Sequence, residues 1–386
     1  MFVKNSTITG HLPKLNVAMY GLTSEGYRLA AELVDKAQVT IIDETLQMAM
    51  SVDSQFLRKN PHLGRLMSEE PLLGLKPLER VLGDAQVVFF TPRLRRPSDE
   101  ALIEANTKMR DVSRYLSKGV TLVNTLPTGP GGNAENIMLL EKQTGLKIAD
   151  SIGYAYVPLR PRDPKPTIIA TAGRDVRPLR DLGFSDSSQN IFSAELEYAS
   201  YVIGATIGAV TEIELARRAR DANVSLQKSS EIYIDDFTKY LYDLKTIQAS
   251  DETGESISYL AGATVKSLEN YVRYVVDETR EVLKEKELKA SRTKISLLWT
   301  LDKYEMRGER IQVADSVQLR LRDYVTDVEV IPGSSIKAGS EVLDPLKHNI
   351  VIACSKEDNE LVKQVRKGHR NLELTLLPAT PDLKVE

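Results

Sequence analysis

The chain has 386 residues, of which 42% are hydrophobic and 27% are charged, and its formal net charge is −3. This length predicts two or three domains at roughly 150 residues each. The small negative charge excludes a general electrostatic attraction to nucleic acid. A single cysteine excludes an internal disulfide framework and a multi-thiolate metal site, and the four histidines have no ligand spacing.

The sequence also lacks the signals of membrane insertion and export. No apolar run approaches the roughly 20 residues that span a bilayer, and the N-terminus has no apolar core of a signal peptide. We therefore expect a cytoplasmic protein with no metal, no membrane partner and no nucleic-acid partner.

Residues 16–44 contain the most informative pattern of the chain. An apolar run at 17–20 meets a glycine turn, and a helical pattern is followed by a second apolar run at 39–42. This is the order of a dinucleotide-binding βαβ unit. In such a unit Gly21 permits the tight turn, Gly26 lets the helix pack closely on the strand, and Asp43 bonds a ribose hydroxyl.

The middle glycine of this fingerprint is absent, because Thr23 stands where the backbone should approach the diphosphate. Two alternatives stay open at this position. Either the Thr23 hydroxyl and the helix N-terminus still bind a phosphate, or the turn no longer receives a dinucleotide. Asp43 has an alternative as well, since an aspartate after a strand often caps a helix.

Strands and helices continue to alternate up to about residue 173. Further strands are expected at 86–90, 121–124 and 167–170, and helices at 99–116 and 133–143. This alternation predicts a mainly parallel sheet with helices on both faces.

The pattern becomes helical from about residue 193 to residue 292. Apolar and small residues recur at helical spacing between 199 and 215 and again between 260 and 283. Two long helices without strands form a poor core of their own. They suit a linker that also forms a dimer interface.

The α/β alternation returns in the last part of the chain. Strands are expected at 294–300, 328–331 and 349–354, and helices at 312–324 and 356–367. The predicted organisation is a Rossmann-like dinucleotide-binding domain at 1–192, a helical linker and dimerisation region at 193–292, and a smaller C-terminal Rossmann-like α/β domain at 293–386.

Three short motifs occur in the order found in a known family. Phe89-Phe90-Thr91-Pro92 closes one expected strand, the sequence Asn-Thr-Leu-Pro-Thr-Gly at 124–129 closes another, and Ala194-Glu195-Leu196 opens the first long helix. With the three-part organisation, these motifs resemble the UDP-glucose/GDP-mannose dehydrogenase family of nucleotide-sugar dehydrogenases. The resemblance covers the chain from about residue 15 to residue 380.

The resemblance implies NAD or NADP as the cofactor, no metal, and a nucleotide or nucleotide sugar as the ligand of a homodimer. The cofactor would lie on the first fingerprint and on the strand-closing motifs, at Gly21, Thr23, Gly26, Asp43, Thr91, Pro92 and Thr125. The substrate would lie on Lys303, Arg307 and Arg310 of the last domain, which as an alternative are solvated charges.

The catalytic residues of the family are the part that this chain does not preserve. The family uses a cysteine to hold an aldehyde, whereas Cys354 is expected in a buried strand. The family's oxyanion-stabilising lysine is replaced by Glu197, whose charge has the wrong sign, and its asparagine by Tyr201. The active-site glutamate has no counterpart in residues 154–159. We therefore assign no catalytic residue.

Three further groups have two interpretations each. The glycine-rich segment 128–133 either approaches a cofactor or only connects a strand to a helix. The basic segments 93–96 and 160–165 either bind phosphate or form solvated loops. Tyrosines aligned with the family's active site either fill its volume or supply an acid/base hydroxyl; they are Tyr154, Tyr156, Tyr198 and Tyr201.

Two functions from different classes remain open. The first is a divergent NAD(P)-dependent oxidoreductase on a nucleotide sugar, without the standard four-electron oxidation. The second is a catalytically inactive, dimeric nucleotide-binding or interaction protein on the same fold, which the missing cysteine, lysine and glutamate favour. The broader 6-phosphogluconate and hydroxyacid dehydrogenase group gains no support, because Glu197 and Ile207 offer no lysine on the central helix.

Overall fold

The computed structural model describes residues 14–69, 75–96, 98–148, 150–160, 170–173, 177–184, 190–224, 231–250, 256–337, 343–368 and 373–381. The chain divides into two compact units. The first unit comprises 1–93, 105–126 and 133–194, and the second comprises 94–104, 127–132 and 195–386. The three-part division with boundaries at 192 and 292 remains a prediction.

The first unit is built on a sheet of eight strands in the order β4-β3-β2-β1-β5-β6-β7-β8. Neighbours from β2 to β7 pair in parallel, while β3, β4 and β8 pair antiparallel at the two edges. The strands are β1 (Leu15–Tyr20), β2 (Ala37–Asp43), β3 (Met48–Val52), β4 (Lys76–Pro77), β5 (Val87–Phe90), β6 (Thr121–Asn124), β7 (Gly153–Tyr156) and β8 (Ala170–Gly173).

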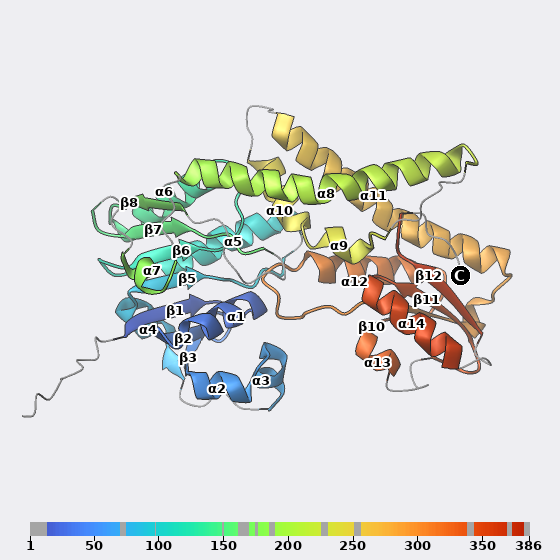
Figure 1. Cartoon of the computed structure of the whole chain (residues 1–386), viewed down its shortest axis with the longest axis horizontal. Helices are drawn as coiled ribbons and strands as arrows, with labels where there is room; N and C mark the ends of the chain where they lie inside the picture. The colour runs from blue at the N-terminus through green and yellow to red at the C-terminus, as the bar shows by residue number, and fades with distance from the viewer. Residues whose placement is uncertain are drawn as a thin grey trace, which may run out of the picture. The chain divides into compact units, whose positions relative to one another are not determined.

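The central strands β5 and β6 are buried along their whole length, as continuous apolar runs in a parallel sheet should be. Helices accompany the sheet as the alternation predicted (Figure 1). They are α1 (Ser24–Leu33), α2 (Ser54–Lys59), α3 (Leu63–Glu69), α4 (Leu78–Asp84), α5 (Ser98–Ser113), α6 (Gly132–Thr144) and α7 (Arg177–Asp181). The strand expected at 167–170 falls mostly outside the described residues, and β8 is described from Ala170.

The second unit combines long helices with a smaller parallel sheet of order β10-β9-β11-β12. Its strands are β9 (Thr293–Leu298), β10 (Val328–Ile331), β11 (His348–Ala353) and β12 (Leu374–Pro378). Its helices are α8 (Ile191–Asp221), which begins at the edge of the first unit, α9 (Ile234–Thr238), α10 (Leu241–Ala249), α11 (Ser256–Glu285), the 3₁₀ turn η1 (Ala290–Arg292), α12 (Glu309–Leu321), α13 (Gly333–Lys337) and α14 (Lys356–Gly368). The α/β fold class with two sheets and a central long-helix region is therefore confirmed.

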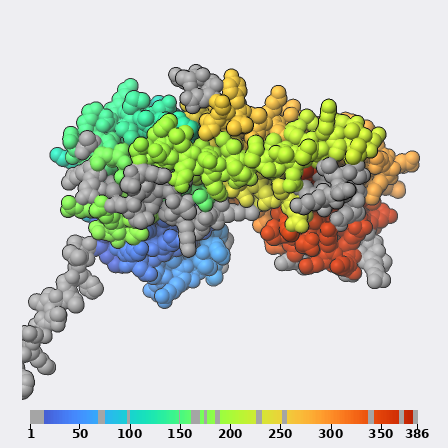
Figure 2. Space-filling model, turned by 45° about the horizontal axis from the view of Figure 1, so that its top comes forward, coloured from blue at the N-terminus to red at the C-terminus, as the bar shows by residue number. Residues whose placement is uncertain are grey.

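The helices α8 and α11 lie side by side (Figure 1). The Ser267 hydroxyl donates to Glu214 at 2.7 Å, and the Arg220 guanidinium lies 3.9 Å from the centre of the Tyr274 ring. The apolar stripe of α11 is buried within the unit from Ala261 to Leu283, whereas Tyr259 and Leu260 at its start are exposed. In contrast, α8 leaves one face exposed and forms a yellow-green band on the surface in Figure 2. By length and composition this helix could also cross a membrane, which differs from the expectation that no apolar run of the sequence approaches that length.

Candidate functional site

The order of strands in the first sheet defines where a ligand would bind. The chain passes from β1 to β2 on one side and later places β5 on the other side of β1. Loops diverge at such a switch point, and ligands of open α/β sheets bind there, beyond the carboxyl ends of the strands. The residues predicted to hold the cofactor lie at this edge, either at the end of β2 or directly after β1, β5 and β6.

The two glycines of the fingerprint have clear packing roles. Gly21 has a φ of +123°, and a Cβ there would lie 2.0 Å from the carbonyl oxygen of Thr91. A Cβ on Gly26 would lie 2.8 Å from the Thr91 hydroxyl oxygen. Only glycine therefore lets the turn after β1 and the start of α1 pack against the loop after β5.

The threonines at this edge bond the chain itself. The fully buried Thr23 hydroxyl accepts the Gly26 N–H at 3.1 Å, which caps α1, and donates to the Thr91 carbonyl at 3.2 Å. The Thr91 hydroxyl donates to the Tyr20 carbonyl at 3.2 Å, and the Thr125 hydroxyl donates to the Phe90 carbonyl at 2.5 Å. Pro92, which follows Thr91, supplies no N–H at all.

Asp43 caps a turn at the end of β2. Its Oδ1 accepts the backbone N–H of Thr45 at 2.9 Å and that of Leu46 at 3.1 Å. These bonds cap the turn between β2 and β3, where no helix begins, so the helix-cap alternative for this residue is wrong. The bond from Asp43 to a ribose remains a prediction.

The residue after Asp43 was not identified from the sequence and lies at the centre of the site. Glu44 Oε2 accepts the Leu22 N–H at 3.2 Å, and Glu44 Oε1 accepts the Arg93 N–H at 2.9 Å. The Lys108 ammonium lies 3.3 Å from Oε1 and donates to the Arg93 carbonyl at 2.5 Å. The Glu44 side chain is only 5% exposed. The one local signal in the sequence that could have identified Glu44 is its position directly after Asp43, as the second of two adjacent acids.

These contacts test whether the edge fits a dinucleotide. A diphosphate needs the backbone N–H groups of the turn after β1 as donors. The Leu22 N–H is bonded to Glu44 and the Gly26 N–H to Thr23. A second anion beside the Glu44 carboxylate would meet a like charge at short range. In this conformation, two of the N–H groups of the turn are therefore not available to the diphosphate of the cofactor that the fold implies.

A second internal carboxylate lies on the glycine-rich segment 128–133. Buried Glu195 accepts the Gly131 N–H at 2.7 Å and the Thr128 hydroxyl at 3.3 Å. A Cβ on Gly129 would lie 2.4 Å from the Thr246 carbonyl oxygen, so this turn packs directly on the end of α10. The space against this segment is therefore occupied by Glu195 and by the end of α10, both of the second unit.

The arginines predicted to bind the substrate are buried in ion pairs of the second unit. Arg307 Nε donates to Asp243 Oδ1 at 2.8 Å, and the other oxygen of Asp243 accepts the Tyr198 hydroxyl at 2.8 Å. Arg310 pairs with Asp235 at 2.7 Å and with Glu305 at 2.5 Å.

Lys303 alone among the predicted substrate residues is exposed, and its carbonyl accepts a hydrogen bond from Arg95 at 2.8 Å. Arg95 belongs to the basic segment 93–96, so this part of the segment holds a loop of the second unit. Of the segment 160–165, residues 161–165 lie outside the described residues.

The start of α9 covers the carboxyl ends of the second sheet. The Asp235 N–H donates to the Cys354 carbonyl after β11 at 3.1 Å, and the Ile234 N–H donates to the Ala379 carbonyl after β12 at 3.0 Å. The Trp299 indole, which follows β9, donates to Asp235 Oδ1 at 2.7 Å. The ligand-binding edge of this sheet is thus occupied by the main chain.

Burial changes the protonation of this cluster. Desolvation raises the pKa of Glu309 to about 7, with Arg307 opposing the shift and Asp243 and Glu305 adding to it. Desolvation also raises the pKa of Asp243, against the opposing effect of Arg307. Four carboxylates face two guanidiniums here, so protonation of a carboxyl group removes an excess of negative charge.

The positions aligned with the family's active site have structural partners. Tyr154 is fully buried and donates to Asn133 at 2.6 Å, and Tyr201 and Tyr240 share a hydrogen bond of 3.0 Å. Cys354 directly follows β11 and is 2% exposed, and burial raises the pKa of its thiol well above the usual value. In the described part of the chain, no group of three His, Cys, Asp or Glu residues could hold a metal.

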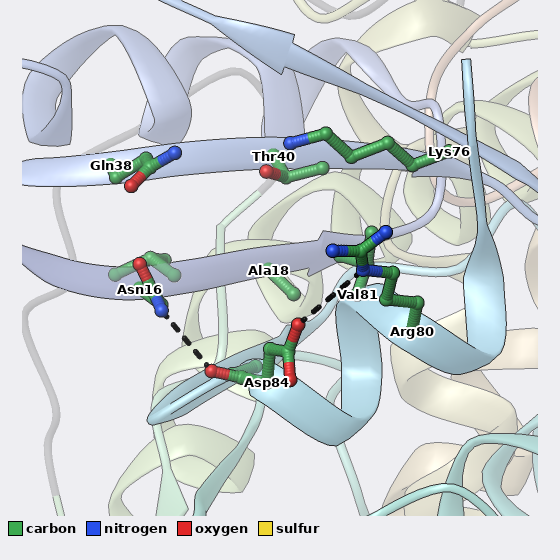
Figure 3. A pocket seen from close by; sticks show the side chains of 10 residues that line it. Asn16, Ala18, Gln38, Thr40, Lys76, Arg80, Val81 and Asp84 are labelled. Carbon is green, nitrogen blue, oxygen red and sulfur yellow. Dashed lines mark hydrogen bonds and ion pairs between the residues drawn. The ribbon is translucent and has the colours of Figure 1, made fainter.

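A separate hollow of about 220 Å³, with a mixed polar and apolar lining, lies on the first sheet near the start of β1 (Figure 3). Asn16, Gln38 and Thr40 line it from β1 and β2, Lys76 lines it from β4, and Arg80 and Asp84 line it from α4. The Arg80–Asp84 pair is 3.9 Å apart and its side chains are 79% and 69% exposed. Because the charges are solvated, the hollow has the character of an open surface groove.

Comparison with known proteins identifies the class of fold. A scan against protein-family models and a search of curated proteins found no match. The chain is similar to the UDP-D-ManNAc dehydrogenase of Pyrococcus horikoshii, with a TM-score of 0.62 and 14% identity over 95% of this chain and 96% of that one. It is also similar to a UDP-glucose dehydrogenase of Pyrobaculum islandicum, with a TM-score of 0.58 and 14% identity over 98% of this chain and 96% of that one. The chain therefore has the nucleotide-sugar dehydrogenase fold, as the motifs predicted.

Proposed function

We propose that this chain is a catalytically inactive, dimeric protein on the nucleotide-sugar dehydrogenase fold, which acts by binding or interaction. The observation that carries the proposal is the burial of Arg307 and Arg310 in ion pairs with Asp243 and Asp235. A substrate diphosphate would have to replace a buried carboxylate on each arginine. Leaving one partner of a buried pair uncompensated costs about 3–5 kcal/mol.

The chemistry of the remaining groups supports inactivity. Glu197, in place of the oxyanion-stabilising lysine, is exposed and carries the opposite charge. The buried Cys354 thiol has a raised pKa, so it offers no thiolate for a covalent intermediate. The alternative of a two-electron NAD(P)-dependent oxidoreductase also needs a cofactor site that the bonds of Glu44 and Thr23 occupy.

The proposal includes a cytoplasmic location and no metal, membrane or nucleic-acid partner. A nucleotide or nucleotide sugar remains the proposed class of ligand, and it would bind at the first sheet only once the Leu22 and Gly26 N–H groups are released. The polar contacts of α8 with α11, through Glu214 and Arg220, favour a helix packed on protein over a membrane span.

The dimer is proposed to form on the open face of α8. Leu196, Ile207 and Leu215 are exposed on this face, and a Cβ on Gly204 or Gly208 would meet nothing. Small residues between large apolar ones let two helices approach closely, and a second copy would cover the patch. In light scattering, we expect twice the chain mass of 43.0 kDa for the wild type and 43.0 kDa for Ile207→Glu. A wild-type particle of 43.0 kDa at micromolar concentration would contradict the dimer.

Inactivity is tested by following NADH and NADPH absorbance with UDP-glucose and with UDP-D-ManNAc. We expect no sustained reduction of either cofactor by the purified chain. Sustained NADH production that scales with protein concentration would overturn the proposal.

A further inference from the structure

The two loops that diverge at the switch point are joined by one side chain. The loop after β1 supplies the Leu22 N–H, and the loop after β5 supplies the Arg93 N–H. The Glu44 carboxylate accepts both, one on each oxygen, at 3.2 Å and 2.9 Å. Lys108 of α5 adds an ammonium 3.3 Å from the same carboxylate.

This donor set suits a phosphate as well as it suits a carboxylate. Two convergent backbone N–H groups and a lysine provide both hydrogen bonds and positive charge for an oxyanion. The set lies where the strand order places a ligand in an open α/β sheet. A phosphate and the Glu44 carboxylate would need the same donors and carry charge of the same sign, so only one of them can be bound.

We propose that Glu44 is an internal substitute for the phosphate of a nucleotide ligand and holds the ligand site of the first unit closed. The inference deepens the proposed function, on which it rests, because it names what prevents the dinucleotide from binding. The glycines that shape the turn are still present at Gly21 and Gly26. We therefore assign the closure of the phosphate site to Glu44, beside which the Thr23 hydroxyl holds the Gly26 N–H.

A similar arrangement elsewhere in the first unit provides a matched control. Glu141 on α6 accepts the Ile148 N–H at 3.0 Å and pairs with Lys147 at 2.6 Å. It therefore also joins a carboxylate, a backbone N–H and a lysine. Ile148 precedes β7, so this cluster lies toward the amino ends of the strands, where ligands of such sheets do not bind. The Glu141 side chain is 24% exposed, against 5% for Glu44.

The experiment compares the full-length wild type with Glu44→Ala, Glu44→Gln and Glu141→Ala. Each protein is titrated calorimetrically with NAD and separately with inorganic phosphate, and its thermal denaturation is followed with and without phosphate. We expect no binding by the wild type at millimolar ligand. We expect Glu44→Ala to bind NAD at least about tenfold more tightly, as the removal of one close like charge implies.

The variants also separate the contributions of charge and space. Glu44→Ala should melt below the wild type, and phosphate should restore part of the loss. Glu44→Gln keeps the shape without the charge and should show a smaller gain in binding. Adding Lys108→Met to Glu44→Ala should weaken the gained binding, because Lys108 supplies the positive charge. Glu141→Ala should gain no binding.

The inference is overturned if folded Glu44→Ala and Glu44→Gln bind NAD and phosphate no better than the wild type. It is also overturned if Glu141→Ala gains as much binding as Glu44→Ala. Circular dichroism checks folding, and Glu44→Gln keeps the test decisive if the alanine variant does not fold. The proposed function fails on a different result, namely turnover of a nucleotide sugar by the wild type. In that case the role of Glu44 is still decided by comparing the NAD affinity of Glu44→Ala with that of the wild type.

Discussion

The two sheets of this protein are closed at their carboxyl edges in different ways. In the first unit, one carboxylate, Glu44, accepts two backbone N–H groups from the loops that flank the switch point. In the second unit, the main chain at the start of α9 bonds the carbonyls that follow β11 and β12, and ion pairs of Arg307 and Arg310 are buried beside it. The first edge is closed by the Glu44 side chain, whereas the second edge is closed by main chain and ion pairs that belong to the core of the second unit.

Because of this difference, we expect the edge of the first sheet to be a binding site that can reopen, and the edge of the second sheet to be one that cannot. The first closure consists of the hydrogen bonds of one side chain, Glu44, to the Leu22 and Arg93 N–H groups and of its ion pair with Lys108, which is 19% exposed to solvent. The second closure can open only if α9 leaves the sheet and buried charges lose their partners, which costs several kcal/mol for each broken pair. We therefore expect ligand binding to be recoverable in the first unit, whereas buried ion pairs stabilise the second unit at the corresponding edge.

The largest effect is expected when the second closure is broken. Arg307→Met removes the cation that faces Asp243, and both side chains are buried. An uncompensated buried carboxylate should lower the free energy of unfolding by about 3–5 kcal/mol. Calorimetric and urea denaturation of the variant and the wild type measure this loss.

Two control variants sharpen this prediction. Arg307→Met combined with Asp243→Asn removes both charges and should recover much of the loss. Arg80→Ala breaks an exposed pair with Asp84 and should change stability by less than about 1 kcal/mol. If Arg307→Met lowered the free energy of unfolding as little as Arg80→Ala, the buried ion pairs would not contribute to the stability of the core.

The next effect is a pH dependence from Glu309. Its pKa is raised from 4.5 to about 7 in the folded chain. Between these values the folded state binds more protons than the unfolded state, so stability should fall as pH rises from about 4.5 to about 7 and then level off. At about 1.4 kcal/mol for each unit of pKa, the loss is at most roughly 3.5 kcal/mol.

Glu309→Gln tests this dependence, because glutamine does not titrate. The variant should be more stable than the wild type above about pH 7 and should lose much of the slope between about 4.5 and about 7. A residual slope of the same sign is expected from Asp243, whose pKa is also raised. Parallel stability–pH curves for the two proteins would show that Glu309 stays charged in the fold.

The fold could be predicted from the sequence because its signals are local. Apolar runs and glycines report burial and tight turns within a few residues, and the positive φ of Gly21 follows directly from the turn after β1. The resemblance in motif order identified the same fold as the structural neighbours.

The closure of the sites could not be predicted, because its partners are distant in the chain. Glu44 is 22 residues from Leu22 and 64 from Lys108, and Arg307 is 64 residues from Asp243. A charged residue has the same sequence pattern whether it binds a ligand or another residue of the chain. The choice depends on which loops the tertiary fold brings together.

A smaller effect is expected from Thr23, which caps α1. Thr23→Ala should lower the free energy of unfolding by about 1–2 kcal/mol, because the Gly26 N–H and the Thr91 carbonyl lose their partner. Thr23→Ser keeps both bonds and is the matched control. Neither change should create NAD binding while Glu44 is present. If Thr23→Gly alone created NAD binding, the missing middle glycine, and not Glu44, would be what prevents NAD from binding.

The smallest effect is expected from Asp43, and it depends on the state of the site. Its carboxylate accepts the N–H groups of Thr45 and Leu46 in a turn at the surface. Asp43→Ala should therefore cost about 0.5–1 kcal/mol of stability, and Asp43→Asn should cost less because it keeps an acceptor. In the wild type, a calorimetric titration with NAD should be unchanged by Asp43→Ala, since the closed site binds nothing. In the Glu44→Ala background, the same change should weaken NAD binding by about fivefold, the size of one hydrogen bond to a ribose. Equal NAD affinities of Glu44→Ala with and without Asp43→Ala would mean that Asp43 only caps its turn and that the opened site holds the phosphate alone.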